Sequence, residues 1–196
     1  MFSNFPAKAG PIGVFDSGYG GLTILHEIRQ LLPQYDYMYL GDNARAPYGS
    51  RSFEVVYQFT RQAVLKLFEQ GCHLVILGCN TASAKALRSI QQRVLGIIRT
   101  TVESIGELTT TRHIGVLATE GTIRSLSYEL EVQKLFPDIK VSGQACPLWA
   151  AIVEAHEADS PGADYFVKKR IDQLLLKDPD IDAIVLGCTH YPLIKE

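Results

Sequence analysis

Short apolar runs alternate with longer amphipathic segments along most of this chain. Runs of this length fit strands, and the regular recurrence of apolar residues every three or four positions in the segments between them is typical of helices. The strands are predicted at residues 11–15, 35–41, 73–78, 93–98, 113–118, 139–145 and 182–187. The helices are predicted at residues 21–32, 53–70, 81–91, 100–108, 125–136 and 163–177. This alternation predicts an α/β fold built on mostly parallel sheets that are flanked by helices.

One junction in this pattern is unusually tight. The helix predicted at 81–91 runs almost directly into the strand predicted at 93–98, whereas helix-to-strand connections usually take about 2–6 residues. Either the helix ends near Ser89, or residues are absent from the chain between about Ile90 and Val94. The spacing favours the second interpretation.

The strand and helix units also repeat. The stretch "IGVFDSGYGGLT" at 12–23 is echoed by "IGVLATEGTIRS" at 114–125. Each of them is followed by an apolar run that ends in Gly-Cys, first "LVILGCNTAS" and later "AIVLGCTHYP". The repeat predicts two pseudosymmetric α/β domains, residues 1–99 and 100–196, each of which contributes one cysteine from the end of a strand. The alternative is that any two strand–helix units look alike.

Composition excludes several classes of protein. The chain has 196 residues, a formal charge of −2 and 46% hydrophobic residues, without the basic stripe that nucleic-acid binders usually carry. No apolar run approaches the ~20 residues that span a bilayer, and the first residues lack the apolar core of a signal peptide. We therefore predict a cytoplasmic protein with no nucleic-acid or membrane partner.

The four cysteines are better explained as reduced thiols than as disulfides or metal ligands. A chain of this length without an export signal usually keeps its thiols reduced. Their spacing does not match the CxxC or HxxxH patterns of common zinc sites. We interpret Cys72 and Cys146 as small buried hydrophobic residues. Cys79 and Cys188 lie in matched contexts where a helix should begin, a position that lowers a thiol pKa, and we expect both to be functional.

Four polar, glycine-rich stretches follow predicted strands, at 15–21, 41–49, 78–83 and 187–192. Ligands of open parallel sheets bind at the carboxyl ends of strands, so these stretches are expected to form one site. In the first stretch, Asp16 can orient a group or accept a proton, and Ser17 with nearby amides can hold an anion. His190, two residues from Cys188, is a candidate proton partner. Glu154 is either a site residue or an acid on a helix surface.

With these residues considered, the chain resembles the glutamate racemases of the aspartate/glutamate racemase superfamily. The matching stretches occur in the family's order and span nearly the whole chain: "IGVFDSGYGGLT", "YLGDNARAPYG", "GCNTASAKAL", "VLATEGTIRS", "IVEAHE" and "GCTHYP". The resemblance implies an isomerase that interconverts L- and D-glutamate without a cofactor or a metal and supplies D-glutamate for peptidoglycan synthesis. It also implies an active site between two domains. We further expect a homodimer.

The resemblance implies a role for each matching residue. Cys79 and Cys188 would be the catalytic acid/base pair, with Asp16, Glu154 and His190 assisting proton transfer. The substrate-binding residues would be Asp16, Ser17, Tyr48, Gly49, Asn80, Thr81, Thr189 and His190. Two thiols on opposite faces of one carbon would have their sulfur atoms roughly 6–8 Å apart, since each must approach the carbon to about 3–3.5 Å.

The sequence departs from the family pattern in two places and leaves other functions open. Thr100 stands where the family usually has proline, and family members usually continue beyond the position of Glu196 to complete the first domain. We therefore expect the C-terminal part of the family fold to be absent from this chain. The alternatives are a racemase for aspartate or another amino acid, a cysteine amidohydrolase using Cys188 and His190, and a non-catalytic amino-acid-binding module.

Overall fold

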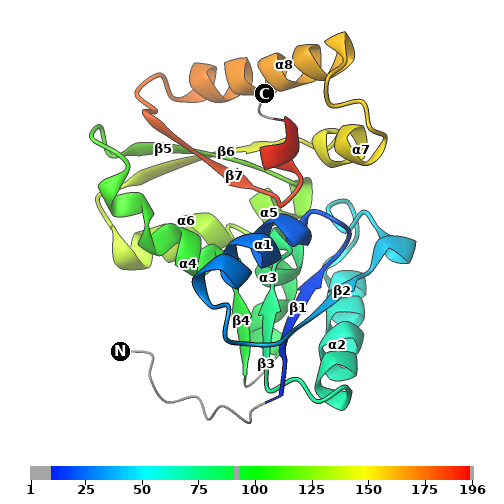
Figure 1. Cartoon of the computed structure of the whole chain (residues 1–196). Helices are drawn as coiled ribbons and strands as arrows, with labels where there is room; N and C mark the ends of the chain where they lie inside the picture. Colours follow the sequence, from blue (N-terminus) through cyan, green and yellow to red (C-terminus); the bar gives the residue numbers. More distant parts are fainter. Residues whose placement is uncertain (1–9, 91–92, 195–196) are drawn as a thin grey trace.

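The computed structural model describes residues 10–90 and 93–194. Two parallel sheets form two lobes, one above the other in Figure 1. The sheet of the first lobe has the order β2-β1-β3-β4, and that of the second lobe has the order β6-β5-β7. The strands of the first lobe are β1 Ile12–Asp16, β2 Tyr37–Gly41, β3 Leu74–Leu77 and β4 Val94–Gly96. Those of the second lobe are β5 His113–Ala118, β6 Lys140–Ala145 and β7 Ala183–Gly187.

Helices flank both sheets. Those of the first lobe are α1 Gly21–Leu31, α2 Phe53–Glu69 and α3 Asn80–Ala86. Those of the second lobe are α5 Glu120–Arg124, α6 Ser127–Leu135, α7 Trp149–Glu154 and α8 Pro161–Lys177. The connecting helix α4 Ile97–Glu103 packs against α6 and α3. Figure 1 shows α8 across the outer side of the second sheet, with α6 and α4 on its other side. Within the described residues, no helix is both long and apolar enough to span a membrane.

The internal repeat appears as a matched topology. In each lobe the first strand of the repeat is central, with the second strand on one side and the third on the other. All paired strands run parallel. The pairing of Ile12 in β1 with Leu74 in β3 corresponds to the pairing of Ile114 in β5 with Ala183 in β7. The predicted α/β fold with two mostly parallel sheets is confirmed. The predicted boundary at residues 99 and 100 falls within α4 and stays a prediction.

The apolar face of α2 shows why the amphipathic segments fold as helices. Ser52 caps the helix by accepting a hydrogen bond from the Val55 amide. Val56, Ala63 and Leu67 lie on one face of the helix, two turns and then one turn apart, and all are buried in the core of the first lobe. Burial of each large aliphatic side chain contributes about 1.5–3 kcal/mol. Helix α2 thereby covers one side of β1, β2 and β3.

Most predicted elements differ from the observed ones at an end, the helix predicted at 100–108 is α4 Ile97–Glu103, and two short helices were missed. The strand predicted at 93–98 ends at Gly96, because Ile97 and Ile98 begin α4, where Ile98 joins the second lobe's core. A short apolar run fits a buried helix as well as a strand. The missed helices, α5 and α7, are too short to show a helical period.

The tight junction has a partial explanation. Helix α3 ends at Ala86 and a 3-10 turn covers Leu87–Ser89, which agrees with the alternative that the helix ends near Ser89. The predicted absence of residues between Ile90 and Val94 concerns residues 91–92, which lie outside the described residues.

Candidate active site

A cavity of about 460 Å³ lies between the two lobes and is lined by both Cys79 and Cys188. Asp16 is the one predicted site residue that does not line it. The others do: Ser17, Tyr48, Gly49, Cys79, Asn80, Thr81, Glu154, Cys188, Thr189 and His190. The loops that follow β1, β2, β3 and β7 therefore meet at one place. They can do so because the carboxyl ends of the strands in the two parallel sheets face each other.

Cys79 marks the point where β3 passes into α3. The Gly78 amide continues the sheet pairing by donating to the Phe15 carbonyl at 2.8 Å. Cys79 then caps α3, because its Sγ accepts a hydrogen bond from the Ala82 amide at 3.4 Å. The Ser17 hydroxyl lies 3.4 Å from the same sulfur. The thiol is thus held in the cavity wall by the first turn of α3 and by the residue that follows β1.

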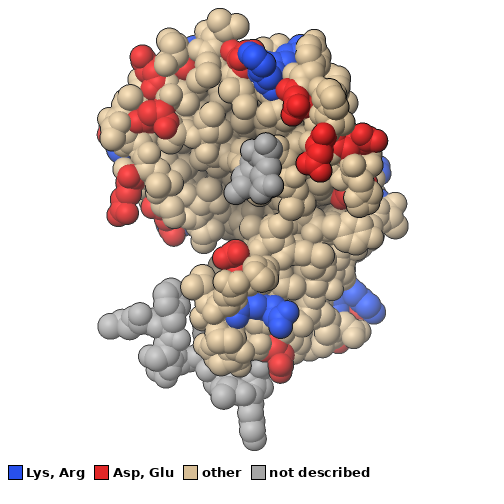
Figure 2. All heavy atoms as spheres, turned by 45° about the horizontal axis from the view of Figure 1, so that its top comes forward, with Lys and Arg blue, Asp and Glu red and all other residues tan. Residues whose placement is uncertain are grey.

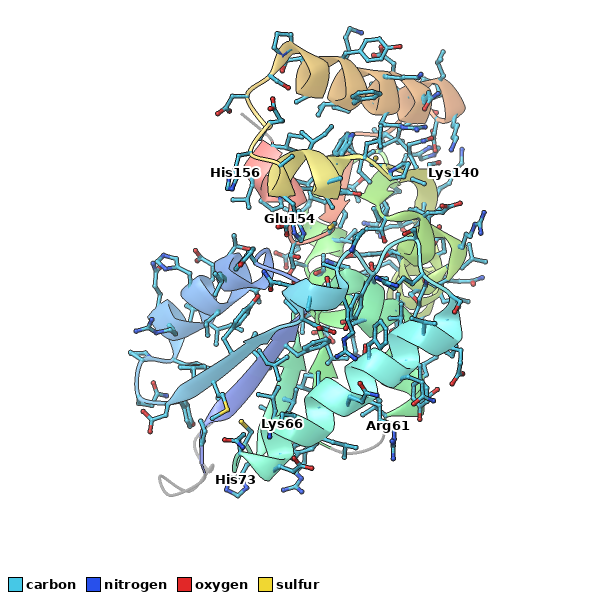
Figure 3. The ribbon with its side chains drawn as sticks, turned by 90° about the vertical axis from the view of Figure 1, so that its right-hand side faces the viewer. Arg61, Lys66, His73, Lys140, Glu154 and His156 are labelled. Carbon is cyan, nitrogen blue, oxygen red and sulfur yellow. The ribbon has the colours of Figure 1, made fainter. Side chains whose placement is uncertain are left out.

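Cys188 occupies the equivalent position after β7, and a line of polar groups leads away from it. Its Sγ lies 3.8 Å from His190 Nδ1, and His190 Nε2 lies 2.5 Å from Glu154 Oε1. Glu154 is the last residue of α7, and Figure 3 shows it where the second lobe faces the first. Glu154 therefore lines the cavity, although its side chain is 37% exposed.

Polar and backbone contacts join the lobes on both sides of the cavity. Thr189 Oγ1 donates to Asp16 Oδ2 at 3.1 Å, and Asp16 is completely buried. Next to it, a Cβ atom on Gly20 would lie 2.5 Å from Thr189 Oγ1, so only glycine allows this approach. On the other side, the Gly121 amide donates to the Gly49 carbonyl at 2.9 Å.

Burial controls the protonation of the two thiols. It raises the pKa of Cys79 to about 11, and the negative charge of Asp16 adds to this, despite hydrogen bonds from Ser17 and Ala82. Burial raises the pKa of Cys188 further above its ordinary value. The expectation that the helix position lowers the thiol pKa was wrong. Removal of Cys79 from water outweighs the amide dipoles of the seven-residue α3, and Cys188 is followed only by the 3-10 helix Tyr191–Ile194. Both shifts favour the protonated thiol at neutral pH in the ligand-free protein.

Comparison with known proteins assigns the chain to a family. The model of the Asp/Glu/Hydantoin racemase family matches residues 19–196. The chain belongs to this family. A glutamate racemase of Ruegeria sp. (strain TM1040) is 39% identical to it, over 94% of this chain and 74% of that protein. The predicted family and enzyme class, an isomerase of the racemase type, are confirmed.

Solved structures of the family share the fold. The glutamate racemase isoform RacE1 from Bacillus anthracis is 38% identical with a TM-score of 0.84, over 96% of this chain and 71% of that chain. The glutamate racemase from Francisella tularensis in complex with D-glutamate is 36% identical with a TM-score of 0.87, over 95% of this chain and 71% of that chain. The predicted absence of a C-terminal part of the fold stays a prediction.

The cavity is also lined by Asn43, Ala46 and Pro47, which lie in the predicted stretch 41–49 but were not named as site residues. The sequence analysis missed four further lining residues: Thr119, Ala150, Ala151 and Ala155. Thr119 follows β5 as Ser17 follows β1. The internal repeat aligns Thr119 with Ser17, so the repeat could have identified Thr119 as a site residue. Ala150 and Ala151 belong to α7, one of the missed short helices.

Possible metal ligands gather away from this cavity. Within residues 10–90 and 93–194, the group of His, Cys, Asp and Glu side chains close enough to share an ion is His113, Asp178 and Asp180. Asp178 already binds His113 Nδ1 at 2.8 Å, Lys140 Nζ at 3.1 Å and Ser142 Oγ at 3.0 Å. The lysine supplies the positive charge that a metal would bring.

The raised thiol pKa values lead to a prediction for the ligand-free racemase. Alkylation of Cys79 by iodoacetamide should increase with pH up to about 11, because only the thiolate reacts. Mass spectrometry of the separate cysteine peptides measures the extent of alkylation at each thiol. A rate that follows pH with a clear midpoint reports the thiol pKa, whereas restricted access lowers the rate at every pH. A midpoint below pH 8 for either Cys79 or Cys188 would contradict the burial argument.

Proposed function

We propose that this protein interconverts L- and D-glutamate without a cofactor, with Cys79 and Cys188 as the two acid/base groups. The observation that carries the proposal is that both thiols line one cavity from different lobes. Each follows the third strand of its repeat, β3 or β7. The identity to glutamate racemases supports glutamate as the substrate. The D-glutamate complex of the Francisella tularensis enzyme adds to this.

Inversion at Cα needs a base on one face and an acid on the other, since a single group would have to cross the molecular plane. In the direction from L to D, the Cys188 thiolate takes the α-proton and the electron pair of the broken C–H bond stays on the substrate. The Cys79 thiol then gives its proton to the opposite face and is left as thiolate. The two cysteines exchange protonation states, and the reverse reaction uses them in the opposite order.

The residues beside the thiols suit the charges of this reaction. The α-ammonium group of the substrate brings a positive charge beside the buried thiols, which lowers the cost of forming a thiolate there. Asp16, Glu154 and His190 assist proton transfer, and His190 can take a proton from Cys188 while Glu154 holds its other nitrogen. The polar groups of Ser17, Asn80, Thr81 and Thr189, with Tyr48 and Gly49, bind the substrate.

Circular dichroism of L- and D-glutamate, with aspartate as the control and no added cofactor, tests the proposal. We expect the signal of either glutamate enantiomer to decay to zero and that of aspartate to persist. Racemisation of aspartate in preference to glutamate would overturn the substrate assignment. Binding of glutamate without loss of signal would favour the non-catalytic amino-acid-binding module.

One observation favours a second candidate, a cysteine amidohydrolase. Cys188, His190 and Glu154 stand in the order of nucleophile, base and orienting acid. An acyl-enzyme burst with an amide substrate would support it. This candidate leaves Cys79 without a role, so we place it second.

The wider biological setting follows from the same proposal. We propose that the D-glutamate formed supplies peptidoglycan synthesis, and the family resemblance supports this. The cytoplasmic location and the homodimer stay predictions.

A further inference from the structure

Asn80 belongs to the first lobe, but a residue of the second lobe orients its side chain. The Tyr128 hydroxyl donates to Asn80 Oδ1 at 2.6 Å. Tyr128 lies in α6 and Asn80 begins α3, and the two side chains are 2% and 4% exposed. Asn80 lines the cavity that holds both thiols, whereas Tyr128 does not. A ligand in this cavity therefore meets Asn80 and not Tyr128, which lines a neighbouring cavity together with Asn80, Cys188 and Thr189.

The direction of this hydrogen bond decides which end of the amide is available. An asparagine side chain has one acceptor oxygen and one NH₂ donor, which occupy similar positions. The tyrosine hydroxyl takes the oxygen, and burial raises the pKa of Tyr128, so the hydroxyl remains a donor at any working pH. Nδ2 makes no hydrogen bond with another described residue, and it is not among the fully buried unpartnered atoms. Nδ2 is thus the end left for a ligand.

The second lobe also holds the next residue of the same helix turn. Thr81 Oγ1 lies 2.9 Å from Thr119 Oγ1, which in turn lies 3.1 Å from Thr122 Oγ1. Two successive residues after Cys79 are therefore attached to the opposite lobe through buried hydroxyl groups. This attachment keeps the Asn80 amide in one position relative to both cysteines.

We propose that Tyr128 is a positioning residue whose hydroxyl turns the Asn80 amide so that Nδ2 donates to a carboxylate of the substrate. The inference rests on the proposed function, because a carboxylate substrate needs a donor at this point. Without the hydroxyl, the amide can rotate and present its oxygen to the carboxylate, which repels it. Tyr128 thereby affects substrate binding more than the proton transfers at the two sulfur atoms.

The test is the Tyr128→Phe variant, which keeps the ring and removes the hydroxyl. We expect KM for both glutamate enantiomers to rise about tenfold or more, as for a lost hydrogen bond to a charged group, while kcat changes by only a few-fold. In an Asn80→Ala background, Tyr128→Phe should leave KM unchanged, because no amide remains to be oriented. Thr60→Val is the matched control, since Thr60 is also buried and its hydroxyl donates to the Val56 carbonyl at 2.7 Å.

The outcomes separate this inference from the proposed function. The wild-type protein is assayed first, and absence of glutamate racemisation there counts against the proposed function. If the wild type is active, an unchanged KM in Tyr128→Phe overturns the role of Tyr128, even where the melting temperature falls. A rise in KM of equal size in the Asn80→Ala background also overturns it, because the effect then does not pass through Asn80. Thr60→Val should lower the melting temperature without changing KM.

Discussion

Replacing either Cys79 or Cys188 with serine is expected to lower the rate of glutamate racemisation by at least about 10²–10⁴-fold, the usual effect of losing a positioned proton-transfer group. A serine hydroxyl is far less acidic than a thiol and forms no base at neutral pH. Both thiols line the same cavity, so each loss should stop inversion in both directions. Replacing Cys72 or Cys146, which are packed in hydrophobic cores, should leave turnover within a few-fold.

The two variants should also differ in a way that identifies the face each thiol serves. Cys79→Ser keeps Cys188, so it should retain more proton exchange or elimination from L-glutamate or its analogues. Cys188→Ser should retain more of these reactions from the D enantiomer. Deuterium incorporation at Cα, or elimination from an analogue with a β-leaving group, measures this for each enantiomer. Equal losses for both enantiomers would contradict the facial assignment, and full racemisation in either variant would refute the two-base mechanism.

Gly20→Ala is expected to lower kcat/KM by about 100-fold, because catalysis loses on that scale when reacting groups shift by about 1 Å. The new Cβ atom would lie 2.5 Å from Thr189 Oγ1 and 2.9 Å from His190 Nδ1. The second lobe must move away, which breaks the hydrogen bond from Thr189 to Asp16 and displaces His190 from Cys188. Steady-state kinetics with both enantiomers measures the effect.

Gly162→Ala is the control for the glycine change. A Cβ atom on Gly162 would meet only Ser160 Oγ at 3.6 Å, an ordinary contact, and the residue lies in α8. Gly162 is the second residue of α8, where alanine is compatible with the helix, so this variant should stay folded and keep full activity. Wild-type kcat/KM in Gly20→Ala would show that the lobes do not need this close contact.

The parts of the fold that were predictable from the sequence depend on local patterns. A buried parallel strand such as β3 is a continuous apolar run, and a helix such as α2 shows a regular apolar face. The internal repeat places Cys79 and Cys188 at equivalent strand ends, and this holds in the structure. Ile97 and Ile98 show the limit of such reasoning, since both begin α4 and Ile98 is buried in the core of the second lobe, which the local pattern does not reveal.

The electrostatics of the site could not be predicted in the same way. The position of Cys79 at the start of a helix is visible in the sequence, but its burial beside Asp16 results from tertiary packing, and burial decides the direction of the pKa shift. Glu154 likewise joins the site because α7 brings it against His190. Tyr128 gives no sequence signal at all, since its hydroxyl reaches Asn80 only after the lobes assemble.

The most direct test of two-base catalysis is the position of deuterium after brief reaction of L-glutamate in D₂O. The thiol that donates to the far face carries solvent deuterium, whereas the thiolate that removes the α-proton holds that proton in a closed site. At low conversion, we expect deuterium at Cα of the D-glutamate product and protium at Cα of the recovered L-glutamate. Starting from D-glutamate should give the mirror result. Equal deuterium in product and recovered substrate would mean that one base serves both faces, and would contradict two-base catalysis by Cys79 and Cys188.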